Sequence, residues 1–266
     1  MEQDKVFTQA KILSQTQISQ GIFDLTLEAP QIAERAKSGQ FVNVYLNDPS
    51  RLLPRPISIC DFSPKNGTIR LVYRVTQRVS GSGTQLLSSV PEGGRIDVLG
   101  PLGNGFTIPQ DPGTVCLVGG GIGIPPMIGL GKRMARSGAD VVYVLGYRTN
   151  DLFLAHEAAQ TGALVISTDD GTAGVHGTVV DAILSEGILP DVYYACGPKM
   201  MLKGLLGLAA KQQVPAWLSL EERMACGIGA CLGCVCQTKQ IDGHSHVKNA
   251  RVCTEGPVFA AEDVVL

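Results

Sequence analysis

The residues that most clearly indicate chemistry in this chain of 266 residues are cysteines near its end. Cys226, Cys231 and Cys234 are spaced C-x4-C-x2-C, and Cys253 follows after eighteen further residues. This spacing is typical of the ligands of a plant-type [2Fe–2S] cluster. Glycines between the cysteines allow the backbone to wrap closely around such a cluster. We therefore expect these four thiolates to bind iron.

Two other metal centres would use similar residues, but the spacing favours neither. A zinc module usually pairs its ligands as C-x2-C twice, and only one such pair is present. A Rieske-type centre needs two histidines; His244 and His246 lie in the tail but not in a C-x-H setting, so we interpret them as solvated loop residues. We interpret Cys236 as a nearby non-ligand, and Cys60 and Cys116 as small core residues.

A second candidate site is a glycine-rich segment between an expected strand and an expected helix. It has the form G-x-G-x-x-P, with proline where a Rossmann fingerprint has its third glycine. Backbone N–H groups at the beginning of a helix can bind phosphate. A later C-G-P tripeptide ends another strand of the same region, where ligands of open α/β sheets collect. The candidate dinucleotide-binding residues are Gly119, Gly120, Gly121, Gly123, Pro126, Gly197 and Pro198.

Asp169 follows the third strand of the same region and bears on the choice of dinucleotide. An acidic residue beside the adenosine ribose favours a free diol over a 2′-phosphate, which indicates NAD rather than NADP. A plain acidic turn is the alternative interpretation.

Upstream, two short segments contain residues suited to binding a flavin dinucleotide. Arg55 lies in an Arg-Pro-Ile-Ser segment, and the planar guanidinium of arginine suits a pyrophosphate. Ser58 could hydrogen-bond the edge of a flavin ring. Gly83 and Thr84 could offer backbone and hydroxyl donors to phosphate.

The elements that must position these residues fall into three regions. Short apolar or alternating runs with turn-forming residues between them predict an antiparallel barrel or sandwich in the first hundred residues. The expected strands are Ile22–Leu27, Phe41–Leu46, Ile57–Phe62, Ile69–Val75 and Arg95–Leu99.

From about Thr114, expected strands and helices alternate, which predicts a doubly wound parallel sheet. Thr178 and Asp181 form a capping box at the beginning of one helix. The expected strands are Val115–Val118, Val141–Leu145, Leu164–Thr168, Val192–Cys196 and Ala216–Leu220, and the expected helices are Pro125–Arg136, Leu152–Ala159, a helix through Leu184, and Pro198–Gln212.

Apolar periodicity ceases after Glu221, so we expect the tail to depend on a metal centre rather than on a hydrophobic core. The predicted fold class is therefore α+β and multi-domain. We expect an FAD-binding antiparallel β-barrel over residues 1–102, an NAD-binding α/β domain over 103–218 and a small [2Fe–2S] module over 219–266.

Composition limits the classes of function. A formal net charge of −2 gives no electrostatic argument for nucleic acid. The polar N-terminus does not resemble a signal peptide, and no apolar stretch approaches the length of a membrane span. We therefore expect a cytoplasmic protein, where eight reduced cysteines need a reason other than disulfides.

Taken together, these motifs resemble a known family. R-P-x-S, G-G-G-I-G-x-P-P and C-G-P, in this order, are similar to the ferredoxin reductase superfamily. The cysteine segment with its flanks, Glu222–Cys231 and Gly256–Phe259, and the junction Gly100–Phe106 resemble the electron-transfer subunit of NAD-dependent (class 1B) dihydroorotate dehydrogenase. The resemblance covers essentially the whole chain.

The resemblance implies cofactors, site residues and a partner. The FAD-binding residues would be Arg55, Pro56, Ile57, Ser58, Val72, Tyr73, Arg74, Gly83 and Thr84, and the cluster ligands would be Cys226, Cys231, Cys234 and Cys253. Ser58 beside the flavin and Cys196 beside the nicotinamide would be the catalytic residues. The partner would be an FMN-containing catalytic subunit that oxidises dihydroorotate in pyrimidine biosynthesis, in a heterotetramer of two plus two. Electrons would run from that FMN through the cluster and FAD to NAD+.

Electron counting agrees with this order, because nicotinamide exchanges two electrons at once, the cluster exchanges one, and a flavin can do both. Two alternatives would use some of the same motifs. One is a diaphorase-type FAD and iron–sulfur subunit of a hydrogenase or a ferredoxin-linked complex. The other is a non-catalytic iron–sulfur or zinc module with a degenerate nucleotide fold.

Overall fold

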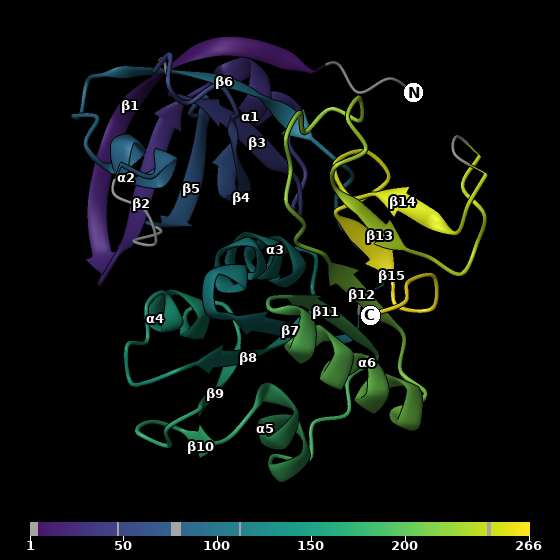
Figure 1. The fold of residues 1–266 in the computed structure, drawn as a ribbon. Helices are drawn as coiled ribbons and strands as arrows, with labels where there is room; N and C mark the ends of the chain where they lie inside the picture. Colours follow the sequence, from purple (N-terminus) through teal and green to yellow (C-terminus); the bar gives the residue numbers. More distant parts are fainter. Residues whose placement is uncertain (1–4, 47, 76–80, 112, 244–245) are drawn as a thin grey trace.

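The computed structural model describes residues 5–46, 48–75, 81–111, 113–243 and 246–266. His244 and the N-terminal residues 1–4 lie outside these ranges. Figure 1 shows a barrel, a sheet covered by helices, and a small C-terminal part beside both.

The N-terminal part is a closed antiparallel barrel with the strand order β1-β2-β5-β4-β3-β6. Alternate residues of each strand fill its interior; on β5, for example, Ile69, Leu71 and Tyr73 belong to the barrel core. The strands are β1 (Val6–Ser19), β2 (Ile22–Glu28), β3 (Phe41–Tyr45), β4 (Arg55–Ser63), β5 (Thr68–Arg74) and β6 (Arg95–Leu102).

Three elements of the barrel were not predicted. Strand β1 is polar along most of its length, and only Ala10 and Ile12 of its residues are buried. The helices α1 (Pro30–Arg35) and α2 (Gly83–Ser88) are too short to give a periodic pattern, and each is held by the apolar residues that it buries. Ser82 caps α2 by accepting a hydrogen bond from the N–H of Gln85.

The second part is a seven-stranded sheet in the order β10-β9-β8-β7-β11-β12-β15, parallel except that β15 runs antiparallel to β12. The doubly wound α/β prediction is therefore confirmed, as is the capping box of Thr178 and Asp181. The strands are β7 (Thr114–Gly120), β8 (Asp140–Tyr147), β9 (Ala163–Thr168), β10 (Val175–His176), β11 (Val192–Cys196), β12 (Ala216–Ser219) and β15 (Val258–Ala260).

Helices cover both faces of this sheet (Figure 1). The helices α3 (Ile124–Arg136) and α4 (Ala155–Ala159) lie on the face toward the barrel, and α5 (Val179–Ser185) and α6 (Lys199–Gln212) on the other. A 3-10 turn, η1 (Gly121–Gly123), precedes α3. The helix expected from Leu152 begins only at Ala155, because Leu154 has a left-handed backbone with φ of +64°.

Helix α3 joins the barrel to the sheet. A Cβ atom at Gly129 would lie 2.0 Å from the carbonyl oxygen of Cys60 on β4, so glycine is required for this close approach. Cys60 and Val72 on the outside of the barrel share one apolar cluster with Ile124 and Met127. The two parts therefore have a continuous packed contact.

Beside this contact, a network of charged side chains joins the barrel to the helices. Arg70 pairs with Asp24 and with Glu157 of α4, each at 2.6 Å. Lys132 of α3 pairs with Glu157 at 2.6 Å and with Asp61 at 3.0 Å, and these side chains are only 20–24% exposed. Partial burial raises the pKa of Glu157, but hydrogen bonds from Arg70 and Lys132 outweigh it and lower the pKa below its ordinary value.

Replacing Glu157 with glutamine is expected to lower the free energy of unfolding by about 1 kcal/mol near pH 7, because it leaves Arg70 and Lys132 partly unpaired. The folded-state pKa of Glu157 is lowered, so its contribution is present above the unfolded pKa and lost as the pH falls through the folded pKa. Urea unfolding of wild type and variant at about pH 7 and about pH 3.5 measures this.

The exposed Glu34 on α1 provides a control, since Glu34→Gln should leave the stability unchanged at both pH values. A Glu157→Gln defect of equal size at neutral and acidic pH would contradict the ionic origin of the effect.

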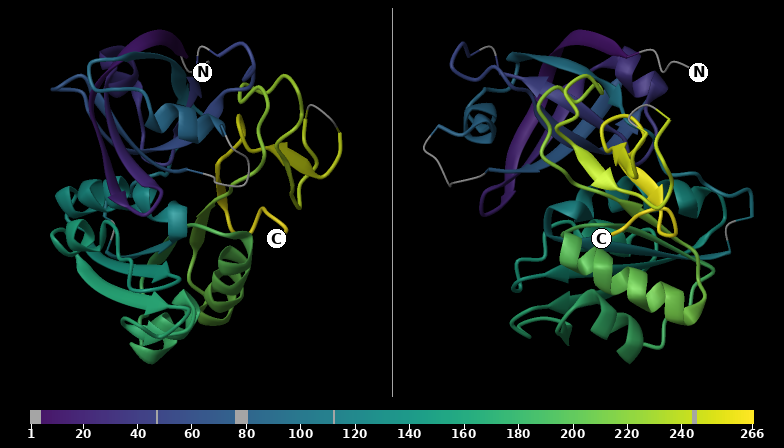
Figure 2. Two further views of the ribbon diagram at one scale, coloured as in Figure 1. Left: turned by 60° about the vertical axis from the view of Figure 1, so that its left-hand side comes forward. Right: turned by 45° about the vertical axis from the view of Figure 1, so that its right-hand side comes forward.

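The C-terminal part combines a small hairpin with the edge strand β15. The hairpin strands are β13 (Val235–Gln237) and β14 (Asn249–Arg251). The tail buries more apolar surface than expected, because Val252, Phe259 and Val264 join the core cluster that includes Leu218 of the sheet and Leu102 of the barrel. The expectation that the tail has little hydrophobic core is therefore wrong where the tail packs against the barrel and the sheet. Figures 1 and 2 show this part lying against both the barrel and the sheet.

Within the described ranges, no helix has the length and apolarity that crossing a bilayer requires.

Candidate iron–sulfur, flavin and dinucleotide site

The four predicted ligand cysteines come from two segments of the tail that the fold brings together. Cys226, Cys231 and Cys234 lie between β12 and β13, and Cys253 follows β14. The side chain of Cys226 hydrogen-bonds that of Cys231, and the side chain of Cys253 hydrogen-bonds that of Cys234. The thiols therefore form two pairs.

Backbone N–H groups surround the first pair. The N–H of Ile228 donates to the sulfur of Cys226 at 3.5 Å, and the N–H of Gly233 donates to the sulfur of Cys231 at 3.4 Å. Burial raises the pKa of Cys226, but hydrogen bonds from the backbone of Ile228 and from Cys231 outweigh it and lower the pKa to about 6. A thiolate is therefore the favoured form of Cys226 at neutral pH.

The second pair is less accessible. Cys234 and Cys253 are each 2% exposed, and burial raises the pKa of Cys253 to about 12, together with the neighbouring thiol of Cys234. In the part of the chain that the structure describes, no three His, Cys, Asp or Glu side chains converge as ligands of a single ion. Two pairs of thiols with N–H donors suit a two-iron cluster, in which each iron takes two thiolates.

The pKa of Cys226 predicts selective alkylation of the apoprotein. At about pH 7 iodoacetamide should modify Cys226 first, with a rate that falls as the pH drops through about 6, and should leave the buried Cys253 unmodified. Peptide mass spectrometry after timed quenching measures both. Reaction at Cys253 ahead of Cys226 would contradict this assignment of the thiolate.

The turn after Cys253 is bound to the junction between barrel and sheet. Asn104 donates from Nδ2 to the carbonyls of Glu255 at 2.9 Å and Val258 at 2.8 Å, and its Oδ1 accepts from the N–H of Val258 at 2.9 Å. A Cβ at Gly103 would lie 2.5 Å from Pro257. The Gly100–Phe106 segment therefore fixes one end of the cysteine segment.

The predicted flavin segments share a region of the barrel wall, although their side chains point in different directions. Ser58, Val72 and Arg74 lie on the outer face, whereas Ile57 and Tyr73 belong to the barrel core. The hydroxyl of Tyr73 donates to Gln15 at 3.0 Å inside the barrel. Only the backbone of Ile57 and Tyr73 is therefore available to a ligand on the outer face.

Arg55 and the beginning of α2 meet although they are far apart in the sequence. A Cβ at Gly83 would lie 1.9 Å from Nε of Arg55, so the guanidinium lies directly over this glycine. The Oγ1 of Thr84 lies 3.5 Å from Oγ of Ser82. The Arg55 guanidinium and the beginning of α2 thus form one polar surface suited to binding a pyrophosphate.

The predicted dinucleotide loops also contact each other. Cys196 at the end of β11 is paired with Gly119 of β7, and a Cβ at Gly123 would lie 2.3 Å from the carbonyl oxygen of Cys196. The side chain of Met201 fills the space beside Gly120 and Gly197, at 2.4 Å and 2.5 Å from where their Cβ atoms would be. These glycines are needed for packing of the loops, apart from any ligand.

The chain just after β12 contains a carboxylate that the sequence analysis did not identify. Glu221 follows β12, and its charge interacts with that of Arg74 on the barrel and with Cys196. The surrounding protein raises the pKa of Glu221, although Arg74 opposes the shift. Burial likewise raises the pKa of the Cys196 thiol, which hydrogen-bonds Ser219. The position of Glu221 directly after a parallel strand was the signal available for finding it.

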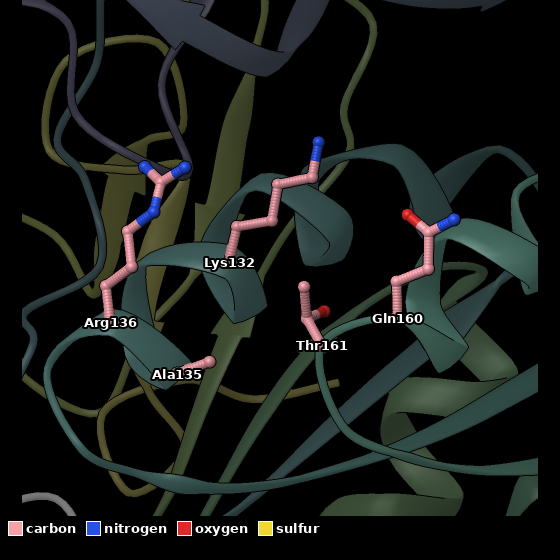
Figure 3. Close-up of a pocket in the computed structure, with 5 residues that line it drawn as sticks. All are labelled: Lys132, Ala135, Arg136, Gln160 and Thr161. Carbon is pink, nitrogen blue, oxygen red and sulfur yellow. The ribbon is translucent and has the colours of Figure 1, made fainter.

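Asp169 lies at the same edge of the sheet, two strands away from β7. Its N–H donates to the carbonyl of Tyr147 at 3.1 Å. A separate pocket of about 400 Å3 lies on the outside of the α/β part and contains none of the predicted site residues. Figure 3 shows its lining residues Lys132, Ala135, Arg136, Gln160 and Thr161, from α3 and the end of α4.

A closed antiparallel barrel packed on a parallel sheet, with candidate ligand residues facing the space between them, defines a ferredoxin-reductase-type fold. A solved ferredoxin NADP+ reductase from Neisseria gonorrhoeae has this fold, with a TM-score of 0.64, 18% identity, and coverage of 77% of this chain and 91% of that one. Residues 9–106 match the oxidoreductase FAD-binding domain, and residues 221–265 match the iron-sulfur cluster binding domain of dihydroorotate dehydrogenase B.

Relatives over nearly the full length specify the family. The electron transfer subunit of dihydroorotate dehydrogenase B (NAD(+)) of Geobacillus thermodenitrificans is 44% identical, over 96% of this chain and 97% of its own, and that of Listeria monocytogenes is 43% identical, over 97% and 99%. The chain belongs to this family of electron transfer subunits. The structure of an NADH-dependent reduced ferredoxin-NADP oxidoreductase, described for flavin-based electron bifurcation, has a TM-score of 0.85 and 31% identity, over 97% and 90% of the two chains.

Proposed function

We propose that this chain carries electrons between the FMN of a catalytic subunit that oxidises dihydroorotate and NAD+, in pyrimidine biosynthesis. The observation that carries the proposal is the position of the cysteine pairs. Their loops pack against the same outer wall of the barrel that bears the Arg55–Ser58 segment. An FAD bound at that segment would therefore lie next to the cluster.

The described residues fit the groups that this function requires. Arg55, Gly83 and Thr84 would bind the FAD pyrophosphate, and Pro56, Ser58 and Arg74 would face the flavin ring. Ile57, Val72 and Tyr73 would contribute backbone, since their side chains are buried. Cys226, Cys231, Cys234 and Cys253 would hold the cluster. When bound, flavin exchanges a hydride with nicotinamide and single electrons with an iron–sulfur cluster.

The dinucleotide would lie across the carboxyl ends of the parallel strands. Gly119, Gly120, Gly121, Gly123, Pro126, Gly197 and Pro198 form the loops there, and Asp169 would face the ribose diol of NAD. Ser58 and Cys196 would lie on the two sides of the reacting rings. No proton transfer is needed for hydride exchange itself, so these residues would orient the rings rather than act as acids or bases.

We divide the chain at 1–102, 103–218 and 219–266. The first boundary is the end of β6, the second falls one residue before the end of β12, and β15 returns to the sheet. We propose a heterotetramer of two such chains with two catalytic subunits. We also propose a cytoplasmic location, where reducing conditions would keep the four ligand cysteines available as thiolates for the cluster. The ferredoxin-linked alternative has weaker support, because the 31% identity to the bifurcating enzyme is lower than the 44% identity to the relative from Geobacillus thermodenitrificans.

Anaerobic purification of the full chain with its partner tests the proposal. The purified protein should contain about one FAD, two iron and two labile sulfide per chain, beside an FMN protein. Cys234→Ser should lose most of the iron, whereas Cys236→Ser, two residues away, should keep it. Zinc in place of iron and sulfide, or a colourless protein, would contradict the proposal.

The catalytic subunit should dock where the cluster loop is exposed and apolar. Leu232 is 45% exposed and Ile228, in the same loop, is 42% exposed. Leu232 has a left-handed backbone with φ of +55°. Asparagine adopts this conformation more readily than leucine. Leu232→Asn should therefore keep the chain folded and loaded, but weaken binding of the catalytic subunit by about tenfold or more.

Calorimetric titration of the catalytic subunit with each variant measures the Kd. Leu189→Asn is the control, since Leu189 is 68% exposed on the α/β part and should not affect binding. Equal affinity of the Leu232→Asn variant and wild type would exclude this docking surface.

A further inference from the structure

Asn43 is a polar residue at the contact between the barrel and the cysteine loop. It is completely buried on β3, between Pro56 on β4 and Leu99 on β6. Its neighbours Val42 and Val44 fill the barrel core, so the carboxamide points outward toward the C-terminal part. This outer surface is otherwise apolar, since Phe41 and Leu99 pack in the cluster that contains Cys234 and Cys253.

The carboxamide holds the first ligand loop. Nδ2 of Asn43 donates to the carbonyl oxygen of Cys226 at 3.0 Å. A Cβ at Gly227 would lie 2.5 Å from the same nitrogen, and Gly227 has a φ of +66°. The loop therefore lies directly on the carboxamide, and glycine is required there both for the backbone conformation and for the close approach.

The hydrogen bond also has a fixed direction. Turning the amide over would place Oδ1 against the Cys226 carbonyl, oxygen against oxygen. In the observed orientation Oδ1 is buried and has no hydrogen-bond partner among the described residues. A buried unpaired acceptor costs stability, so an apolar side chain would suit this apolar surface better. The presence of asparagine at position 43 is therefore better explained by the position in which it holds the Cys226 loop than by a gain in stability.

Through β3, Asn43 connects the cluster loop to the proposed flavin-binding strand. Asn43 is paired directly with Pro56, and Phe41 with Ser58, so all four residues lie on one face of the barrel. The Cys226 loop is thus connected to β4 by the side chain of Asn43 and by the pairing of β3 with β4. Because β3 and β4 are hydrogen-bonded neighbours in the closed barrel, this contact fixes where the Cys226 sulfur lies relative to that face.

We propose that Asn43 is a positioning residue for electron transfer between the cluster and FAD. By holding the Cys226 carbonyl it fixes the distance from the ligand sulfur to the flavin face, on which the rate of single-electron transfer depends steeply. The inference rests on the proposed function, but it assigns a role to a residue outside the ligand and flavin-binding sets.

The test compares two electron-transfer steps in the complete complex with its catalytic subunit. In Asn43→Ala, reduction of FAD by NADH should stay within about twofold of wild type, whereas reduction of the cluster should slow by about tenfold or more. Stopped-flow absorbance follows the flavin, and freeze-quench paramagnetic resonance follows the cluster. The g-values of the reduced cluster should also shift, and exchange of the amides of residues 226–229 should become faster.

Asn66→Ala is the control, since Asn66 is exposed in a turn of the same barrel and should alter none of these readouts. Gly227→Ala disturbs the same contact from the loop side while leaving the carboxamide in place. It should slow cluster reduction, and less so when Asn43 is already alanine, because the close contact is then relieved. If Asn43→Ala fails to retain iron, the rate of cluster reduction in Gly227→Ala tests the inference instead.

An unchanged rate of cluster reduction in an Asn43→Ala protein that retains FAD and the cluster would overturn the inference. Equal slowing of FAD reduction and cluster reduction would also overturn it. Additive effects of the two substitutions would also overturn it. A wild-type protein without FAD or without the cluster would instead refute the proposed function, so the two failures are distinguishable.

Discussion

The attachment of the cysteine segment to the barrel is the constraint on which the rest of this structure depends. The hairpin of β13 and β14 is too small to be stable alone, and the ligand loops have little regular structure. Two asparagines hold the segment at its ends. Asn43 binds the loop of Cys226, and Asn104 binds the turn after Cys253. Because both donors belong to the barrel or its junction, the cluster ligands are fixed relative to the proposed flavin face.

The same principle applies to the contact between barrel and sheet. Hydride exchange between two bound rings requires that the surfaces carrying them keep a fixed separation. Helix α3 provides this separation, with Gly129 against the backbone of Cys60 and the network around Glu157 beside it. Close backbone packing sets the distance, and the charged network favours one orientation of the two parts. The charge of Arg74 on the barrel also acts on Glu221 after β12, so the two parts interact electrostatically there as well.

The sequence was most informative where a pattern has a local physical cause. The apolar parallel strands β7, β8, β9, β11 and β12, the capping box of Thr178 and the barrel strands from Ile22 onward were predicted, because each depends on residues near in sequence. The short edge strand β15 was not. Strand β1 and the helices α1 and α2 were not. A polar strand in a barrel is stabilised by hydrogen bonds to its neighbours, and a helix of six residues by the surface that it covers, so neither leaves a periodic signal.

For this protein the sequence by itself determined the kind of chemistry, since four cysteines at fixed spacing, a glycine-rich turn and an arginine–serine segment each indicate a cofactor class. Only the tertiary structure decided which of those residues meet and which way they point. Tyr73 faces the barrel core, while Arg55 reaches Gly83, and the buried Asn43 meets Cys226 across a sequence separation of 183 residues. Such contacts depend on the closure of the barrel and on its packing against the tail, and no local pattern records the distance between residues so far apart.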